Sequence, residues 1–87
     1  HVIILPNSVI NHHDIIKDYT IVASGVCISG EVTLGESCYL GTNSSIIGNV
    51  TIGRLCLVGM GSTVIGDIPE NSVVVGSPAK ISRRLLD

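Results

Sequence analysis

Residues 32–64 read VTLGES, CYLGTN, SSIIGN, VTIGRL, CLVGMG and STV when they are divided into blocks of six. The third residue of every block is Leu, Ile or Val, and the first is Val, Cys or Ser. The same spacing extends back to residue 4. Its aliphatic positions are Ile4, Ile10, Ile16, Val22, Ile28, Leu34, Leu40, Ile46, Ile52, Val58 and Val64. A repeat of fixed length over most of a chain is typical of a solenoid.

A period of six fits short strands joined by tight corners, with one aliphatic and one small side chain pointing inward from each strand. Three such strands close a triangular coil of 18 residues, so residues 18 apart stack in neighbouring coils. Ile16, Leu34 and Ile52 are then expected to stack inside, and Cys38 to lie beneath Cys56. The sequence therefore predicts an all-β fold, a parallel β-helix solenoid over residues 1–66.

The period ends after Val64, where residues 66–72 (GDIPENS) are rich in turn-forming residues. Val73–Val75 fits one more short strand, and Arg83 and Arg84 follow in a basic tail. We therefore expect a short C-terminal extension, residues 67–87, made of a turn, a short strand and a tail.

Glycine follows the inward aliphatic residue in four blocks, at Gly35, Gly41, Gly53 and Gly59. Because glycine adopts a positive φ without steric cost, we expect these residues to turn the corners of the coils.

The composition excludes several classes of function. Five Lys and Arg against seven Asp and Glu give a formal net charge of −2, so the chain has no basic surface for nucleic acid or anionic lipid. No apolar run approaches the roughly 20 residues of a membrane span, and no signal-peptide pattern begins the chain. We expect a cytoplasmic protein that binds neither nucleic acid nor membrane. Cys27, Cys38 and Cys56 lack a C-x-x-C pair and are expected to be reduced, buried thiols.

Two groups of residues resemble the hexapeptide-repeat acyltransferase family, whose fold is a left-handed parallel β-helix. The first is the repeat itself, with Leu34-Gly35-Glu36, Ile52-Gly53-Arg54 and Val58-Gly59-Met60-Gly61-Ser62. The second is residues 76–80 (GSPAK), which resemble the closing Gly-x-Pro-Ala-Lys segment of the family. The left hand is implied by the resemblance alone, because parallel crossovers are otherwise right-handed. Residues 10–16 (INHHDII) further resemble the sialic acid O-acetyltransferase and UDP-4-amino-sugar N-acetyltransferase subfamily.

The resemblance implies direct transfer of an acetyl group from acetyl-CoA to an amine or hydroxyl of a sugar or nucleotide sugar. His12 matches the family histidine and is the candidate general base, since imidazole accepts a proton near neutral pH. The family places a carboxylate directly after this histidine, whereas here His13 follows and Asp14 comes next. Either Asp14 reaches the His12 ring, or a local bulge makes His13 and Asp14 the working pair. Gly30 matches a family glycine whose N–H is proposed to meet the oxyanion; the alternative is a corner that needs glycine.

In the family, active sites lie between the prisms of a homotrimer, and the cofactor runs along the coil edges toward the C-terminus. Small residues with exposed backbone suit such a groove, and the final segment matches the part near the adenine and ribose. The candidate cofactor-binding residues are Gly41, Thr42, Gly59, Met60, Gly61, Gly76, Pro78 and Lys80. Lys80, Arg83 and Arg84 are candidates to meet the phosphates of CoA. No metal site is expected.

Other assignments stay open. Members of this subfamily carry an N-terminal Rossmann-like domain for the nucleotide sugar, and we expect it to be absent from this chain. A γ-class carbonic anhydrase shares the solenoid and binds zinc through three histidines. His1, His12 and His13 match that number, but their spacing is poor for a zinc site. A non-catalytic trimeric scaffold is the second alternative. The acceptor, and the choice between O- and N-acetylation, do not follow from the sequence.

Overall fold

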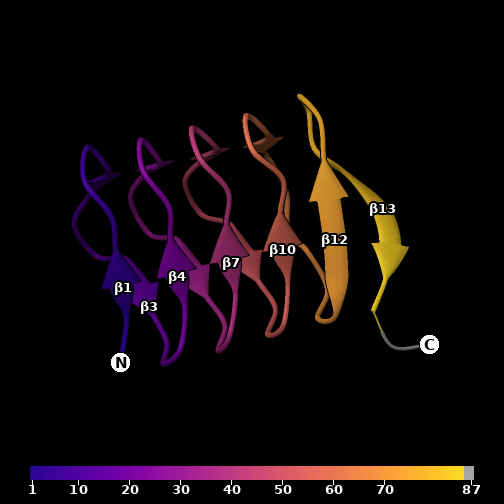
Figure 1. The fold of residues 1–87 in the computed structure, drawn as a ribbon, viewed down its shortest axis with the longest axis horizontal. Helices are drawn as coiled ribbons and strands as arrows, with labels where there is room; N and C mark the ends of the chain where they lie inside the picture. Colours follow the sequence, from indigo (N-terminus) through magenta and orange to yellow (C-terminus); the bar gives the residue numbers. More distant parts are fainter. Residues whose placement is uncertain (86–87) are drawn as a thin grey trace.

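The computed structural model describes residues 1–85, and every regular element in this range is a β-strand. One two-residue strand lies in each six-residue block, and two longer strands follow. The strands are β1 (Ile3–Ile4), β2 (Val9–Ile10), β3 (Ile15–Ile16), β4 (Ile21–Val22), β5 (Cys27–Ile28), β6 (Thr33–Leu34), β7 (Tyr39–Leu40), β8 (Ser45–Ile46), β9 (Thr51–Ile52), β10 (Leu57–Val58), β11 (Thr63–Val64), β12 (Ser72–Val75) and β13 (Lys80–Arg84). The coils stack along the long axis, with the N-terminus at one end and β13 at the other (Figure 1).

Each coil contributes one strand to each of three sheets. Sheet A has the order β1-β4-β7-β10-β12-β13, sheet B β2-β5-β8-β11 and sheet C β3-β6-β9. Ile16 pairs with Leu34 and Leu34 with Ile52, so the register advances by 18 residues from coil to coil. The predicted parallel β-helix with 18-residue coils is confirmed, and the coils wind in the left-handed sense (Figure 1).

The inward side chains stack in the centre of the prism and form its core. From Val22 to Val64 every aliphatic residue of the six-residue series is completely buried. The first coil differs, because its inward residues lie at the N-terminal end of the stack: Ile4 remains 48% exposed, and Ile10 and Ile16 are only partly buried. Hydrogen bonds between coils hold the stack together, as where the Ile21 N–H donates to the Cys38 carbonyl at 2.9 Å.

The three corners of the prism repeat one backbone conformation. We call residues 5–8, 23–26, 41–44 and 59–62 corner 1, residues 11–14, 29–32, 47–50 and 65–68 corner 2, and residues 17–20, 35–38, 53–56 and 69–71 corner 3. The third residue of nearly every segment has a positive φ; examples are Asn7, His13 and Tyr19, with φ of 66°, 67° and 65°. This position recurs three residues after each inward aliphatic residue.

The expected role of the repeated glycines is therefore wrong. Gly35, Gly41, Gly53 and Gly59 are absent from the residues of positive φ. They are needed because neighbouring coils approach closely there. A Cβ on Gly35 would lie 2.6 Å from the Arg54 nitrogen, and one on Gly53 would lie 2.5 Å from the Glu70 nitrogen.

The expectation for the cysteines holds for two of the three. Cys38 and Cys56 are buried, each with 2% of its surface exposed, and are free thiols. Cys27 is exposed, which contradicts the expectation. The reason is its register: Cys27 is the outward first residue of β5, whereas Cys38 and Cys56 precede their strands at the inward small position.

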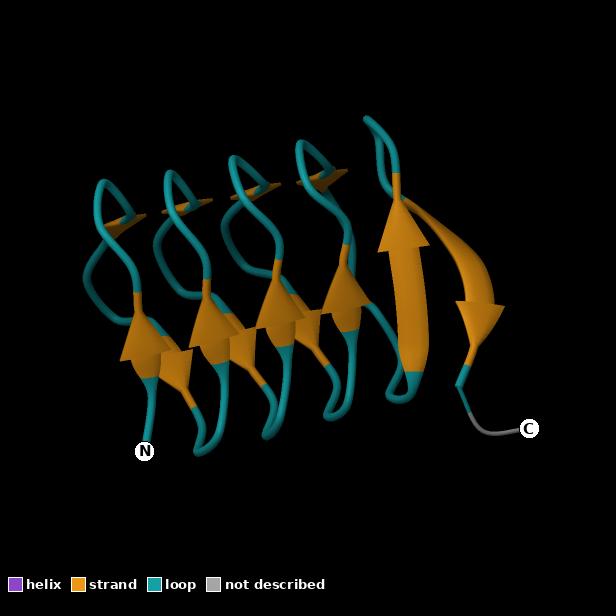
Figure 2. Ribbon diagram, in the orientation of Figure 1, coloured by secondary structure: helices purple, strands orange, loops and turns teal. Residues whose placement is uncertain are grey.

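The C-terminal extension closes the solenoid. Ile68 forms an isolated bridge with Ile52, and β12 pairs in parallel with β10. The chain then reverses, and β13 pairs antiparallel with β12, with an irregularity between Val73 and Val74 (Figure 2). The sequence predicts a tail after Lys80, with Arg83 and Arg84, and not this second strand; residues 86–87 of that tail lie outside the described residues. Within residues 1–85 we find no apolar helix of the length that a bilayer crossing requires.

Candidate active site

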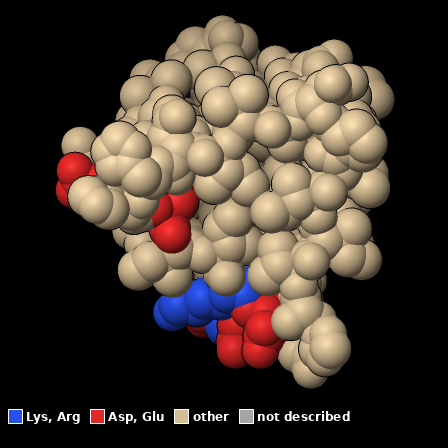
Figure 3. Space-filling model, turned by 90° about the vertical axis from the view of Figure 1, so that its left-hand side faces the viewer, with Lys and Arg blue, Asp and Glu red and all other residues tan. Residues whose placement is uncertain are grey.

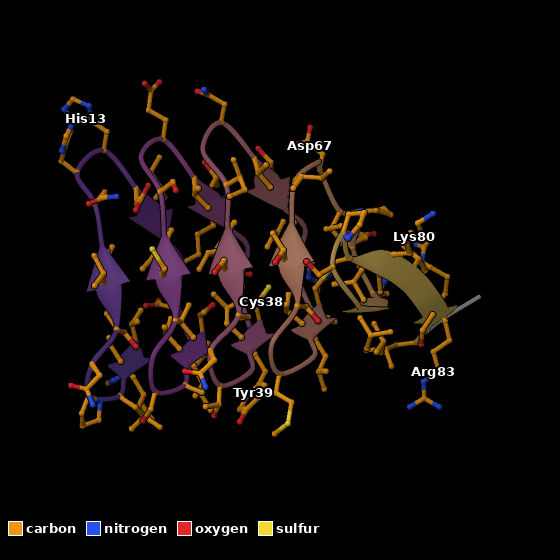
Figure 4. The ribbon with its side chains drawn as sticks, turned by 90° about the horizontal axis from the view of Figure 1, so that it is seen from above. His13, Cys38, Tyr39, Asp67, Lys80 and Arg83 are labelled. Atoms are coloured by element: carbon orange, nitrogen blue, oxygen red, sulfur yellow. The ribbon has the colours of Figure 1, made fainter. Side chains whose placement is uncertain are left out.

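The predicted catalytic residues lie together on corner 2. His12, His13 and Asp14 connect β2 to β3 in the first coil, and Gly30 occupies the same corner in the second coil. A Cβ on Gly30 would lie 3.5 Å from the His12 carbonyl oxygen, so the two residues face each other across neighbouring coils. Figure 4 places His13 at the N-terminal end of this corner, with Asp67 farther along it.

The two histidine rings are exposed and pack on each other. Their centroids are 4.7 Å apart and their planes meet at 88°, an edge-to-face arrangement. His13 takes the left-handed backbone position of the corner, with φ of 67°.

The Asp14 side chain points toward the next coil. Its Oδ1 accepts a hydrogen bond from the Val32 N–H at 2.8 Å, and its Oδ2 is buried without a hydrogen-bond partner among the described residues. Thr20 Oγ1 accepts the Cys38 N–H in the same way at corner 3. Within residues 1–85 no hydrogen bond joins Asp14 to either histidine ring. The carboxylate therefore serves the stacking of coils.

The corner contains no inserted residue. Val9 pairs with Cys27 before the corner, and Ile15 pairs with Thr33 after it, so both strands keep a register of 18 residues. The bulge that would make His13 and Asp14 the working pair is thus not formed, and His12 lies four residues before the inward Ile16, as the uninterrupted repeat predicts.

The corners differ in charge. Corner 1 has no Lys, Arg, Asp or Glu, whereas corner 2 carries only acidic charges, Asp14, Glu31 and Asp67, beside the histidines. Corner 3 carries both signs, on Lys17, Asp18, Glu36, Arg54 and Glu70. Figure 3 shows the mixed charges gathered at the lower edge of the N-terminal end, with acidic groups alone at its left.

Five predicted cofactor-binding residues lie on corner 1, namely Gly41, Thr42, Gly59, Met60 and Gly61. The loop between β12 and β13 continues this corner: the Gly76 N–H donates to Ser62 Oγ at 3.1 Å, and the Thr63 N–H donates to the Gly76 carbonyl at 3.0 Å. Pro78 lies in this loop, and Lys80 begins β13 (Figure 4).

Asn43, which was not among the residues predicted from the sequence, lines a shallow pocket on corner 1 with Thr42, Met60 and Gly61. Its side chain occupies the space that a Cβ would take at Gly25, one coil below. The signal was the alternation of Asn and Gly at positions 7, 25, 43 and 61, all of which have positive φ.

The catalytic candidates and the cofactor candidates do not meet within one chain. Corner 1 lies at the start and corner 2 at the end of each strand of sheet B, so the strands β2, β5, β8 and β11 separate the two corners.

The described residues contain no group of three or more His, Cys, Asp or Glu side chains that could hold a metal ion. His1 lies at corner 3, where its ring packs on Tyr19 at 5.9 Å and its amino group pairs with Asp18 at 2.8 Å. It therefore does not join His12 and His13 on corner 2.

The chain is similar to known proteins both in the sequence of its repeats and in its fold. Residues 31–66 match the family described as bacterial transferase hexapeptide (six repeats). The structure is similar to the acetyltransferase domain of PglB from Neisseria gonorrhoeae FA1090, with 28% identity and a TM-score of 0.91 over 92% of this chain and 39% of that one. It is similar to N. gonorrhoeae serine acetyltransferase (CysE), with 28% identity and a TM-score of 0.91 over 99% of this chain and 38% of that one.

PerB from Caulobacter crescentus, solved in complex with CoA and GDP-perosamine, is also similar, with 26% identity and a TM-score of 0.74 over 94% of this chain and 54% of that one. This chain therefore spans less than two thirds of each of these proteins. The chain is a left-handed β-helix of hexapeptide repeats, and its resemblance to the hexapeptide-repeat acyltransferases is confirmed.

Proposed function

We propose that this chain is the acetyl-transfer unit of an acetyl-CoA-dependent acetyltransferase whose acceptor is an amine or hydroxyl of a sugar or nucleotide sugar. The observation that carries the proposal is the exposed His12 on corner 2 of the coil stack. The PglB acetyltransferase domain matches this structure over 92% of this chain. Two of the three similar proteins are named as acetyltransferases, and the third was solved with CoA.

In the proposed reaction the acceptor nitrogen or oxygen attacks the thioester carbonyl while His12 takes the proton from that atom. The negative charge that develops on the carbonyl oxygen meets the Gly30 N–H, because backbone N–H groups are effective oxyanion donors. The carbonyl then re-forms as the carbon–sulfur bond breaks, and the CoA thiolate takes the proton from the imidazolium. No covalent intermediate with the chain is required.

The separation of the two corners favours an active site built between chains. Corner 1 has no charged side chain, which suits the uncharged pantetheine arm of CoA, and the loop at residues 76–79 with Lys80 extends this groove toward the basic β13. A contact between corner 2 of one copy and corner 1 of the next is head-to-tail, and such contacts close into rings. We therefore propose a homotrimer in which each site takes His12 from one chain and the cofactor groove from its neighbour.

The comparisons favour two acceptor classes. The GDP-perosamine in the PerB complex supports an amino group on a nucleotide-linked sugar. The match to serine acetyltransferase over 99% of this chain makes the serine hydroxyl a second candidate.

Titration calorimetry with acetyl-CoA tests the proposal. We expect one binding site per chain, and release of CoA when an amino sugar, a nucleotide-linked amino sugar or serine is added. The acceptor that supports release identifies the class. Absence of acetyl-CoA binding would contradict the proposal and favour a non-catalytic scaffold.

A further inference from the structure

We propose that His13 is a positioning residue for His12: its ring supports the His12 ring and stabilises the positive charge that His12 acquires during transfer. The inference rests on the proposed role of His12 as the base. It assigns a role to the residue that stands where a carboxylate was expected.

The first step is that Asp14 does not orient the His12 ring: its Oδ2 has no hydrogen-bond partner among the described residues but is buried, whereas His12 is exposed. The Oδ1 of Asp14 is held by the Val32 N–H at 2.8 Å, and no hydrogen bond from His12 to a carboxylate is present among the described residues. The closest aromatic partner of the His12 ring is His13, with ring centroids 4.7 Å apart and planes at 88°.

The second step is that the coil, and not the histidine, sets the backbone at position 13. His13 has φ of 67°, and the equivalent residues Asn7, Tyr19 and Asn43 have φ of 66°, 65° and 60°. The corner thus accepts both an asparagine and an aromatic residue at this backbone position. The edge-to-face contact of the two rings is formed on this backbone without a hydrogen bond between them among the described residues.

The third step is chemical. Edge-to-face packing places the positive edge of one ring against the negative face of the other. When the edge belongs to His12 and the face to His13, a cation on His12 gains a modest stabilisation, which corresponds to roughly 2–5-fold in rate if the cation forms only as the proton is transferred. His13 would then lower the barrier through His12, without contacting the substrate.

Two variants of the full-length enzyme separate this role from a structural one. His13→Asn removes the ring and keeps a residue that this chain uses at Asn7 and Asn43 with the same backbone, whereas His13→Tyr keeps a ring, as at Tyr19. We expect His13→Asn to lower kcat roughly 2–5-fold with an unchanged KM for acetyl-CoA, and His13→Tyr to recover most of that loss. Thermal unfolding of both variants checks that they fold.

Proton NMR of the His12 ring supplies a readout that does not depend on activity. The ring current of residue 13 should shift the His12 ring protons in the wild type and in His13→Tyr, and this shift should disappear in His13→Asn. Equal kcat in the two variants, or an unchanged His12 spectrum in His13→Asn, would overturn the inference. A loss of 100-fold or more in both would make His13 itself the base. His12→Ala, measured in parallel, tests the proposed function separately. If that variant stays active, His12 is not the general base, whatever the His13 variants show.

Discussion

The Asp14 carboxylate shows how one side chain can be taken for catalytic when its contacts are structural. In sequence it stands two places after His12, beside the expected base. In the structure it accepts the Val32 N–H at 2.8 Å and so ties the first coil to the second. Removing one partner of such a bond leaves a buried donor unpaired, and that loss costs more than the bond itself contributes.

We therefore expect Asp14→Ala to lower the free energy of unfolding by about 1–3 kcal/mol. Asp14→Asn keeps an oxygen acceptor at the same position and should lose less. Urea denaturation followed by circular dichroism measures both values. Equal stability of Asp14→Ala and the wild type would contradict the structural role.

The buried thiols make the free energy of unfolding depend on pH in the alkaline range. Burial raises the pKa of both Cys38 and Cys56 above the ordinary thiol value of 9.0. Above pH 9 the thiols of the unfolded chain ionise while those of the folded chain stay protonated, so the unfolded state is stabilised relative to the folded state.

The free energy of unfolding should accordingly fall as the pH rises above 9, and the fall should be shallower in Cys38→Ala. Stability curves of the two proteins between pH 8 and 10.5, compared as slopes, test this. Cys27→Ala is the matched control, because that thiol is exposed and its removal should leave the slope unchanged. Parallel curves for Cys38→Ala and the wild type would count against the account.

At the scale of the element, close stacking of coils decides where glycine is required. A Cβ on Gly35 would lie 2.6 Å from the Arg54 nitrogen, and backbone cannot yield as a flexible side chain can. A Cβ on Gly30 would lie 3.5 Å from its nearest neighbour, which is an ordinary contact.

Gly35→Ala should therefore destabilise the solenoid by about 1–3 kcal/mol, as overpacking does, while Gly30→Ala should change its stability by less than about 0.5 kcal/mol. The melting temperatures of the two variants give the comparison. A Gly30→Ala variant as unstable as Gly35→Ala would show that the coils do not stack at the described spacing.

The strands were predictable because the six-residue spacing of Ile, Leu and Val specifies both the strand and the face that it buries. The glycine geometry was not, because a dihedral preference and a steric need both select glycine, and sequence alone does not separate Gly35 from Gly25. Cys27 is exposed, contrary to expectation, because its register at the first position of β5 outweighs the tendency of free cysteine to be buried. Strand β13 pairs antiparallel with β12. Residues 80–84 (KISRR) did not predict this strand, because they lack the alternation of apolar and polar residues that is typical of one. The candidate base was identified by its register, but the direction of the Asp14 side chain required coordinates.

At the scale of the whole molecule, the proposed homotrimer builds each active site from two chains. Two variants disable opposite halves: His12→Ala removes the base on corner 2, and Thr42→Trp fills the pocket on corner 1 that Thr42 lines with Asn43. Each variant alone should be inactive as a full-length protein.

When the two variants are co-expressed in equal amounts and assemble at random, about a third of the sites in mixed trimers, and so about a quarter of all sites, should combine an intact base with an intact groove. We expect activity to return to about that fraction, with sedimentation confirming trimers. No recovery in mixed trimers would place the complete site within one chain and contradict the assembly.

The central claim is that His12 is the general base of an acetyl transfer, and the effect of His12→Ala on turnover and cofactor binding tests it most directly. A base acts in the transition state, so the full-length variant should lose about 10²–10⁴-fold in kcat while its affinity for acetyl-CoA, measured by calorimetry, stays nearly unchanged. A variant that turns over at the wild-type rate, or that loses activity only because it no longer binds acetyl-CoA, would contradict the claim.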